Sequence, residues 1–400
     1  MARKPHALAL CAPVRTPIGK YGGGLAALSA ADLGTSAARA AIERSGISPD
    51  AIDQVIFGHG RQAGGGPNTA RQVGYRAGVP QEKPAFTLNQ ACGSGLQSVL
   101  AGGRAILLGE ADVVLAGGTE SMSNTPYLLP RARWGYRLGH AELTDGMYRD
   151  GFNDPLSGLV MGETAEELAE ESSIDRAASD AWAVGSQNRS EKARAAGRFE
   201  SEMVPVTVPG RKGDTLVEAD EHPRNGVTVE SLAKLKPVFR DGGRVTAGNA
   251  SGITDGAAAL LVASEDAVQE HGLDVAGWLR DWEVVGVDPR IMGIGPVPAT
   301  RNLLDRWDLE YGDIDQVELN EAFACQVLAC LAELPFDPEK VNPDGGAISL
   351  GHPIGCTGTR ILVTLLHGLA HRGGRWGIAT LCISGGLGIS VLVERAGTDG

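Results

Sequence analysis

Short apolar segments followed by a Gly-Gly pair occur in both halves of this chain. Residues 113–116 form one such segment, and residues 378–383 form another. Continuous apolar runs of this length are typical of strands in a sheet that is covered on both faces. The pattern therefore predicts two buried strands. The 56 glycines among 400 residues favour tight turns between strands and helices.

A helical pattern of apolar residues precedes each of these strands. It covers residues 96–107 in the first half and 361–369 in the second, where the apolar positions occupy a wide arc. Each pattern begins at a Gly-rich turn, at 91–95 and at 355–358. A Gly-rich turn, a helix and a strand therefore follow one another twice.

The two halves repeat one another more widely. The tetrapeptide Ile-Asp-Gln-Val occurs at 52–55 and again at 314–317, upstream of the two Gly-rich turns. In the second half a further strand follows at once, at 389–393. Its first-half counterpart, at 257–263, comes only after a long intervening segment. We infer that this segment is an insertion between two strands of the first half.

These patterns predict an α/β protein with two similar halves and an inserted loop domain. We expect an N-terminal half of residues 1–119 plus 247–272, an inserted domain of residues 120–246, and a C-terminal half of residues 273–400. The insertion is richer in charge and proline, and it carries helical patterns at 162–171 and 175–196.

Composition excludes several classes of function. The 36 basic and 49 acidic residues give a net charge of −13, which argues against a general nucleic-acid or anionic-membrane surface. We find no run of 18 apolar residues, and the first apolar stretch is too short for a signal peptide. Six cysteines without paired spacing predict reduced thiols and a cytoplasmic location.

Cys92 is the first candidate for chemistry, because it stands where a Gly-rich turn meets a helix. The positive end of the helix dipole and the free N–H groups there favour a thiolate, which predicts a nucleophile. Gly93 and Gly95 would let a substrate approach the backbone closely. The alternative is a small buried apolar residue, the usual fate of a free cysteine.

His352 and Cys382 are two further candidates. His352 lies in the second-half turn that corresponds to the turn of Cys92, so the two are expected to meet, and a Cys–His pair activates a thiol. Cys382 lies near the end of an apolar strand, where ligands bind in open α/β sheets. A redox pair of cysteines is the alternative, although no Cys-x-x-Cys spacing supports it.

Asn320 follows the second tetrapeptide strand, and Glu321-Ala322-Phe323 is expected to begin a helix. The amide of Asn320 could hold a water or polarise an oxygen, or it could be an ordinary helix cap. The four remaining cysteines lack partners at metal-ligand spacing and are expected in the core, so no metal site is predicted. They are Cys11, Cys325, Cys330 and Cys356.

Six motifs together resemble those of the thiolases. They are Arg15-Thr16-Pro17, residues 89–95, residues 248–252, residues 320–323, residues 351–355 and residues 381–383. The resemblance runs in order over essentially the whole chain. It implies duplicated α/β halves layered as α-β-α-β-α, and an acyltransferase that makes or cleaves 3-ketoacyl-CoA by ping-pong acyl transfer without a cofactor.

The resemblance also implies roles for single residues. Cys92 would take an acyl group from a thioester, His352 would activate it, and Cys382 would take a proton from the second substrate. Asn320 would fix a water that, with His352, binds a thioester oxygen. The backbone N–H groups of Cys92 and Ser384 would form a second oxyanion hole.

Acyl-CoA and coenzyme A are the implied partners, and the inserted domain is the implied coenzyme A site. The residues that match family contacts there are Arg224, Ser231, Phe239, Ala247, Ser251 and Phe323. The family resemblance also suggests a homotetramer, a dimer of dimers, to which residues 119–149 contribute.

The acyl chain of the substrate is expected to be short. Met161 and Met292 match methionines of short-chain members and, with Phe323, would close the acyl pocket, which favours an acetyl-CoA C-acetyltransferase. Val160 departs from this pattern, because short-chain biosynthetic members often carry His there. The chain also departs from the usual family residues at Thr254, Thr357 and Ser384.

Three alternatives remain open from the sequence. One is a longer-chain 3-ketoacyl-CoA thiolase of fatty-acid β-oxidation. Another is a ketoacyl synthase of the same fold, against which the second cysteine, Cys382, speaks. The third, from a different class, is a non-catalytic acyl-CoA-binding protein on a thiolase frame.

Overall fold

The computed structural model describes residues 7–397, which form one ten-stranded sheet with helices on its faces. The ten strands are β1 (Leu8–Arg15), β2 (Gly19–Lys20), β3 (Gln54–Gly58), β4 (Ala85–Leu88), β5 (Val113–Ser121), β10 (Thr254–Ala263), β11 (Val275–Gly286), β12 (Gln316–Leu319), β13 (Trp376–Ile383) and β14 (Leu387–Arg395). Their order is β12-β13-β14-β11-β1-β10-β5-β3-β4, and β2 pairs with β10 off this path.

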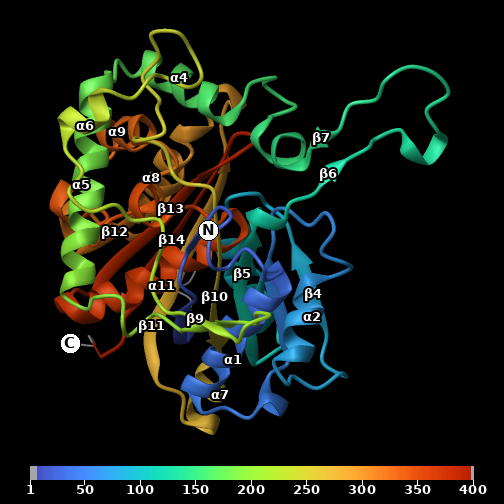
Figure 1. Cartoon of the computed structure of the whole chain (residues 1–400). Coiled ribbons are helices and arrows are strands. Elements are labelled where there is room, and N and C mark those ends of the chain that lie inside the picture. Colours follow the sequence, from blue (N-terminus) through green and yellow to red (C-terminus); the bar gives the residue numbers. More distant parts are fainter. Residues whose placement is uncertain (1–6, 398–400) are drawn as a thin grey trace.

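The two halves contribute equivalent strands. In the first half, β5 pairs in parallel with β3 and antiparallel with β10. In the second half, β13 pairs in parallel with β12 and antiparallel with β14. Strands β1 and β11 pair antiparallel and join the halves. The repeat predicted from the two tetrapeptides is therefore a repeat of sheet topology (Figure 1).

Eleven α-helices surround these strands within the described residues. They are α1 (Ala30–Ser45), α2 (Thr69–Arg76), α3 (Ser94–Leu107), α4 (Met161–Glu171), α5 (Arg176–Ala195), α6 (Val229–Ala233), α7 (Glu265–His271), α8 (Pro296–Trp307), α9 (Ala324–Glu333), α10 (Ala347–Leu350) and α11 (Ile354–Arg372). Seven shorter 3-10 or π turns are η1 (Pro49–Ala51), η2 (Met122–Asn124), η3 (Ala132–Trp134), η4 (Tyr148–Phe152), η5 (Pro289–Ile294), η6 (Tyr311–Asp313) and η7 (Pro338–Lys340).

Helices α3 and α11 form the central layer, between the strands of the two halves. Leu260 of β10 and Leu381 of β13 both join the apolar cluster that contains these two helices. The next residue on β10, Leu261, points the other way and packs with α1 and α2. On β13, Ile378 packs outward with α8 and α9. Since side chains alternate along a strand, the layers are α-β-α-β-α, as the resemblance implied.

Between β5 and β10 the chain leaves the sheet at Ser121 and returns at Thr254. Helices α4 and α5 lie in this segment and confirm both helical patterns expected there. The segment also holds two short antiparallel pairs of strands. They are β6 (Tyr127–Leu128) with β7 (Thr144–Asp145), and β8 (Val206–Val208) with β9 (Thr215–Val217).

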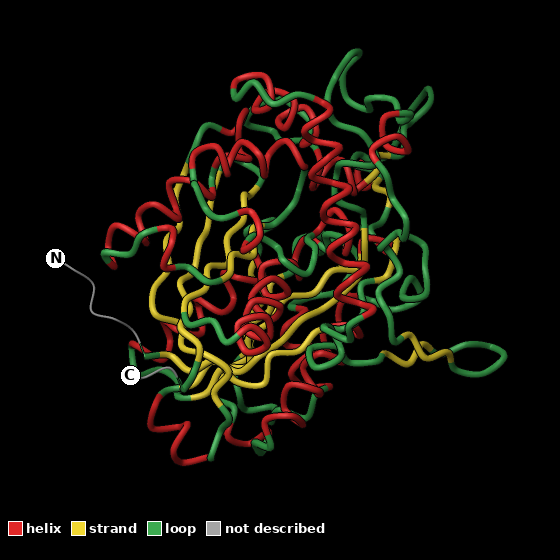
Figure 2. Tube along the Cα trace, turned by 90° about the vertical axis from the view of Figure 1, so that its left-hand side faces the viewer, coloured by secondary structure: helices red, strands yellow, loops and turns green. Residues whose placement is uncertain are grey.

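The arm that β6 and β7 begin extends away from the body of the molecule (Figure 1). In the view turned by 90°, helices lie on either side of the strands (Figure 2). Large apolar side chains on the arm are open to solvent, with Trp134 86% and Leu138 99% exposed. Large apolar residues are normally scattered singly on a surface, whereas here several of them share one arm.

Between residues 7 and 397, every helix is too short or too polar for a membrane span.

Candidate active site

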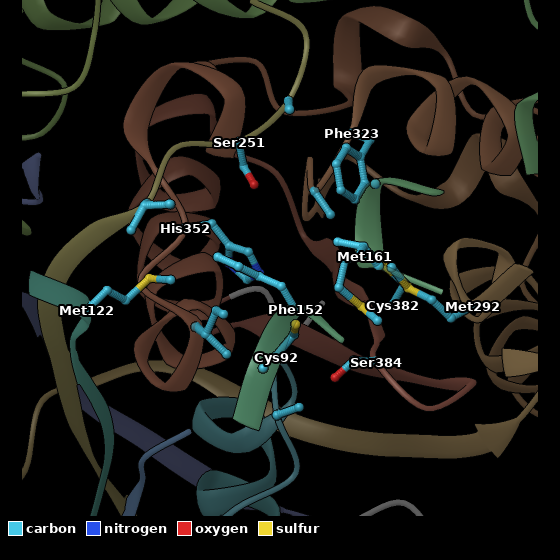
Figure 3. A pocket seen from close by; sticks show the side chains of 18 of the residues that line it. Cys92, Met122, Phe152, Met161, Ser251, Met292, Phe323, His352, Cys382 and Ser384 are labelled. Carbon is cyan, nitrogen blue, oxygen red and sulfur yellow. The ribbon is translucent and has the colours of Figure 1, made fainter. Parts of the chain in front are cut away.

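Cys92 lies in a tight turn directly before helix α3. The hydroxyl of Ser94 accepts a hydrogen bond from the backbone N–H of Gln90 at 2.8 Å and donates one to the carbonyl of Ala91 at 2.7 Å. Ala91 has a φ of 46°, in the left-handed region that few side chains tolerate. Strained backbone of this kind persists where the surroundings fix it, often beside reactive groups. The turn thus holds Cys92 towards the cavity (Figure 3).

The first turns of α3 and α11 touch through glycines. A Cβ added to Gly95 would lie 2.7 Å from the backbone nitrogen of Thr359, and one added to Gly358 would lie 2.3 Å from that of Leu96. Any side chain at either position would separate the helices. This close contact brings the loop of Cys92 and the loop of His352 side by side.

His352 reaches the same cavity with a defined orientation. Its Nδ1 lies 2.6 Å from the hydroxyl oxygen of Thr357, and that hydroxyl donates its own proton to the carbonyl of Pro353 at 3.0 Å. The hydroxyl oxygen must therefore accept from Nδ1–H, which leaves Nε2 unprotonated. Burial lowers the pKa of His352 to about 3, with the charges of Arg360 and Arg61 acting in the same direction. The imidazole is a neutral base, and its Nε2 has no hydrogen-bond partner among residues 7–397.

Cys382 lies near the end of β13 and is 1% exposed. It packs in a small apolar cluster with Met292, Ala322 and Phe323. Burial raises the pKa of Cys382 well above the usual value for a thiol, and the neighbouring Cys92 adds to this. In the resting protein Cys382 is therefore a neutral thiol.

Cys92 differs from the expectation that its helix N-terminus would favour the thiolate. Burial raises the pKa of the Cys92 thiol, and this outweighs Arg61 and the backbone N–H groups of Ser384 and Cys92, which lower it. Desolvation in an apolar wall is the larger effect here. Cys92 is consequently a thiol at neutral pH, next to a histidine that can take its proton.

One cavity of about 210 Å³ collects most of the predicted site residues. The catalytic candidates that line it are Cys92, His352, Cys382 and Ser384, and the candidate substrate contacts are Met161, Phe239, Ser251, Met292 and Phe323, together with Val160. A second cavity of about 330 Å³ holds the other candidate contacts for coenzyme A. These are Arg224, Ser231 and Ala247.

Asn320 is buried behind the cavity, and it does not appear in its lining. Its backbone N–H donates to the carbonyl of Thr380, while both polar atoms of its side chain lack a hydrogen-bond partner in the described part of the chain. A helix cap would bond a backbone N–H, so the cap alternative fails.

The helix expected to begin at Glu321 begins only at Ala324. Phe323 has extended backbone and forms a bridge with Ala250. The carboxylate of Glu321 accepts hydrogen bonds from Trp182 and Ser186. Tertiary contacts therefore hold this segment out of the helix.

Four cysteines expected in the core are buried, and all six cysteines are free thiols. Burial raises the pKa of Cys11, Cys325, Cys330 and Cys356 to about 12 in each case. These thiols are inert. Within residues 7–397, no group of three or more His, Cys, Asp or Glu side chains has an arrangement that could hold a metal ion.

Sequence reasoning missed two functional positions. Arg61 lines the cavity. It follows the C-terminal end of β3, and a position at the end of a strand is also the signal that pointed to Cys382. Thr357 was noted only as a departure from the family, because its contact with His352 depends on the first turn of α11. Neither residue stands out by its type.

Comparison with known proteins agrees with this geometry. The family model for the thiolase N-terminal domain matches residues 8–266, and that for the thiolase C-terminal domain matches residues 273–395. An acetyl-CoA acetyltransferase of Cupriavidus necator is 48% identical, over 95% of this chain and 97% of the relative. One of Chromobacterium violaceum is 48% identical, over 97% and 99%.

Solved structures of such proteins share the whole fold. The acetyl-CoA acetyltransferase of Bacillus anthracis superposes with a TM-score of 0.95 at 44% identity, covering 98% of this chain and 99% of that one. Human mitochondrial 3-ketoacyl-CoA thiolase gives a TM-score of 0.95 at 45% identity, with the same coverage. The chain therefore belongs to the thiolase family, whose members are acyltransferases.

Proposed function

We propose that this protein is an acetyl-CoA C-acetyltransferase, which joins two acetyl-CoA molecules into acetoacetyl-CoA and coenzyme A and catalyses the reverse thiolysis. The observation that carries this is one cavity holding Cys92, His352 and Cys382. In it, a neutral imidazole with a free Nε2 stands with two neutral thiols. The curated relatives named acetyl-CoA acetyltransferase support it.

The first half-reaction loads the enzyme. Nε2 of His352 takes the thiol proton of Cys92 as the sulfur adds to the thioester carbonyl. Coenzyme A then leaves with the proton that His352 took, and an acetyl group stays on Cys92. The backbone N–H groups of Cys92 and Ser384 would stabilise the developing oxyanion, and their lowering of the pKa of the Cys92 thiol supports this role.

The second half-reaction forms the carbon–carbon bond. Cys382 passes its thiol proton to His352, and the resulting thiolate takes a proton from the methyl group of a second acetyl-CoA. The carbanion attacks the acetyl group on Cys92, whose sulfur leaves and takes the proton back from His352. His352 and a water held by Asn320 stabilise the negative thioester oxygen of this substrate. The unpartnered buried amide of Asn320 supports this role, because a buried polar group without a partner is costly unless a water or ligand satisfies it.

Coenzyme A would occupy both cavities. We assign its acyl end to the cavity of Cys92 and other parts of it to the cavity of Arg224, Ser231 and Ala247. A human mitochondrial 3-ketoacyl-CoA thiolase structure in complex with CoA, 43% identical with a TM-score of 0.95, supports coenzyme A as the partner. A thioester is already activated for acyl transfer, so the proposed chemistry needs no metal and no organic cofactor.

A tetramer and a reducing compartment complete the proposal. The exposed apolar side chains of the arm between β6 and β7 would be covered in a dimer of dimers. Because Cys92 and Cys382 act as free thiols, we place the enzyme in the cytoplasm.

The preferred length of the substrate's acyl chain distinguishes this proposal from a thiolase of fatty-acid degradation. Met161, Met292 and Phe323 lie along the wall of the cavity beside Cys382 (Figure 3). One methylene in an apolar pocket is worth about 1–3 kcal/mol, so a closed pocket should reduce kcat/KM steeply beyond four or five carbons. We expect thiolysis to be fastest with acetoacetyl-CoA. A flat or rising kcat/KM from C4 to C10 would instead favour a longer-chain 3-ketoacyl-CoA thiolase.

Mass spectrometry tests the acyl-enzyme directly. After incubation with acetyl-CoA, an acetyl group should appear on Cys92, and Cys92→Ala should abolish turnover while the protein remains folded. An acetyl group on Cys382 or Cys356 instead would overturn the assignment. A non-catalytic acyl-CoA-binding protein would show acetyl-CoA protection of Cys92 from iodoacetamide but no thiolysis.

A further inference from the structure

Arg61 is a buried cation in the wall of the catalytic cavity. It is 6% exposed and lines the same cavity as Cys92. Its guanidinium makes no hydrogen bond or ion pair with the described residues, and the buried Nε has no partner. It lies over the ring of Phe152, at 5.8 Å from the ring centroid, and its charge acts on Cys92 and Glu120 through space.

The surroundings hold Arg61 in place at its backbone. The carboxylate of Glu120 accepts the N–H groups of Gly60 and Arg61, each at 3.1 Å, and that of Gly355 at 2.8 Å. Nε2 of His59 lies 3.2 Å from the same carboxylate. Glu120 thus bonds to four other groups, so its carboxylate acts on the charge of Arg61 through space but accepts no hydrogen bond from the guanidinium.

The chain also leaves room for this guanidinium. A Cβ added to Gly151 would lie 1.8 Å from Nη2 of Arg61, so the side chain lies directly against the backbone there. On this side the cavity wall is otherwise apolar, with Met122, Phe152 and Ile354 clustered together. A buried donor without a hydrogen-bond partner, such as Nε of Arg61, is costly. A guanidinium binds a carboxylate through two parallel hydrogen bonds, which would remove that cost.

We propose that Arg61 binds the terminal carboxylate of a dicarboxylic acyl group, so that the enzyme also acts on 3-oxoacyl-CoA thioesters whose far end is a carboxylate. This inference rests on the proposed thiolase activity and names a further substrate class for the same cavity. A neutral chain of equal length would bring a methyl group, rather than a carboxylate, against the guanidinium. A longer acyl chain then lowers kcat/KM when its end is neutral, and binding of a terminal carboxylate by Arg61 offsets this loss when its end is acidic.

The reaction with 3-oxoadipyl-CoA shows the step. His352 takes the thiol proton of Cys92 as the sulfur adds to the 3-oxo carbon, the bond between carbons 2 and 3 breaks, and the carbanion at carbon 2 takes a proton from Cys382 to leave as acetyl-CoA. Cys382 takes a proton back from His352, and the succinyl group stays on Cys92 with its free carboxylate on Arg61. Coenzyme A then gives its thiol proton to His352 and attacks this thioester, succinyl-CoA leaves, and the Cys92 sulfur takes that proton from His352. The carboxylate itself is unchanged throughout.

The competing role for Arg61 is electrostatic support of Cys92, whose pKa the guanidinium lowers. That role would act on every substrate alike. The ratio of kcat/KM for a carboxylate substrate to that for a neutral one of equal length therefore separates the two roles.

The test measures this ratio with 3-oxoadipyl-CoA and 3-oxohexanoyl-CoA, six carbons each. The wild type should favour the acidic substrate. Arg61→Leu should lower the ratio by roughly tenfold to a hundredfold, the usual effect of removing a charge-assisted hydrogen bond. Arg61→Lys should retain part of the preference. Arg149→Leu is the matched control, because Arg149 is half exposed in the neighbouring turn and does not line the cavity.

One further variant and one further substrate complete the test. Gly151→Ala would displace the guanidinium while keeping its charge, so it should lower the ratio even if Arg61→Leu does not fold. Acetoacetyl-CoA is measured in parallel. If the wild type cleaves acetoacetyl-CoA but prefers the neutral six-carbon substrate, or if Arg61→Leu slows both substrates equally, the inference on Arg61 is wrong. If acetoacetyl-CoA is not cleaved at all, the proposed function itself fails.

Discussion

The hydroxyl oxygen of Thr357 lies 2.6 Å from Nδ1 of His352 and determines which imidazole nitrogen faces the cavity. Its own proton is committed to the carbonyl of Pro353, one helical turn earlier. Thr357 can therefore only accept from Nδ1–H, and the unprotonated Nε2 is left towards Cys92. A hydroxyl thus does the orienting that a carboxylate performs in many other histidine bases, without adding a charge that would raise the pKa of the imidazole.

Removing this hydroxyl should slow the loading of Cys92. In Thr357→Val the Nδ1–H of His352 loses its acceptor, which costs about 1–3 kcal/mol for a buried group. We expect acetylation of Cys92 to slow by roughly tenfold to a hundredfold, since each 1.36 kcal/mol is a factor of ten in rate. Thr357→Ser, which keeps the hydroxyl, should stay near the wild-type rate. Equal rates for the valine and serine variants would contradict the role of the hydroxyl.

The pH dependence of Cys92 alkylation should rise without a plateau at neutral pH. Burial raises the pKa of the Cys92 thiol, so the thiolate fraction increases only as pH rises towards and above the ordinary value of 9.0. The pKa of His352 is lowered to about 3, so this group stays neutral from pH 5 to 9 and adds no inflection near its ordinary value of 6.5. Iodoacetamide rates measured across this range check both statements. A plateau below pH 7 would instead indicate a thiolate–imidazolium pair.

The scaffold of this protein follows from patterns that depend on local sequence. The apolar runs of β5 and β13 and the helices α3 and α11 are visible because buried elements need continuous apolar residues or a wide apolar arc. Because the two halves repeat one topology, the sequence alone predicts that the loops of Cys92 and His352 lie together.

The parts that the sequence did not predict depend on distant contacts. Helix α9 begins at Ala324 because Phe323 pairs with Ala250 in an extended conformation. The sign of the pKa shift of Cys92 depends on how much apolar wall surrounds the sulfur, which a helix N-terminus does not reveal. Likewise, the guanidinium of Arg61 lacks a hydrogen bond to Glu120 because distant contacts give that carboxylate other donors, which the sequence does not reveal.

The inserted segment should be stabilised strongly by one buried guanidinium. Arg15 of β1 is fully buried, and Asp220 accepts from its Nη1 at 2.7 Å and from its Nη2 at 3.0 Å. Glu202 also accepts from Nε of Arg15 at 2.5 Å, so removing Asp220 leaves Arg15 with one carboxylate and costs about 1.5–3 kcal/mol, the usual loss for hydrogen bonds to a charged group. We expect Asp220→Ala to lower the free energy of unfolding in urea by this amount. Glu333→Ala, which breaks the exposed pair with Arg301, is the control and should cost only about 0.2–1 kcal/mol.

Similar losses for the two variants would show that Asp220 contributes no more than a surface pair. The carboxylate also accepts the backbone N–H of Ile18 at 2.8 Å, so Asp220→Asn offers a graded variant. Its amide keeps one acceptor and loses the charge, and its loss should fall between those of the other two.

Cys382→Ser should separate the two half-reactions. Cys382 is buried in an apolar cluster with Met292, and its raised pKa suits a group that passes a proton to and from carbon but does not compete with Cys92 for the acyl group. A serine hydroxyl is a far weaker base, so condensation should slow by about 10²–10⁴-fold, the usual contribution of a positioned base. Acetylation of Cys92 depends on His352 instead and should continue near the wild-type rate. Stopped-flow release of coenzyme A measures the first step, and acetoacetyl-CoA formation measures the second. An equal loss in both steps would mean that the two thiols do not divide the work in this way.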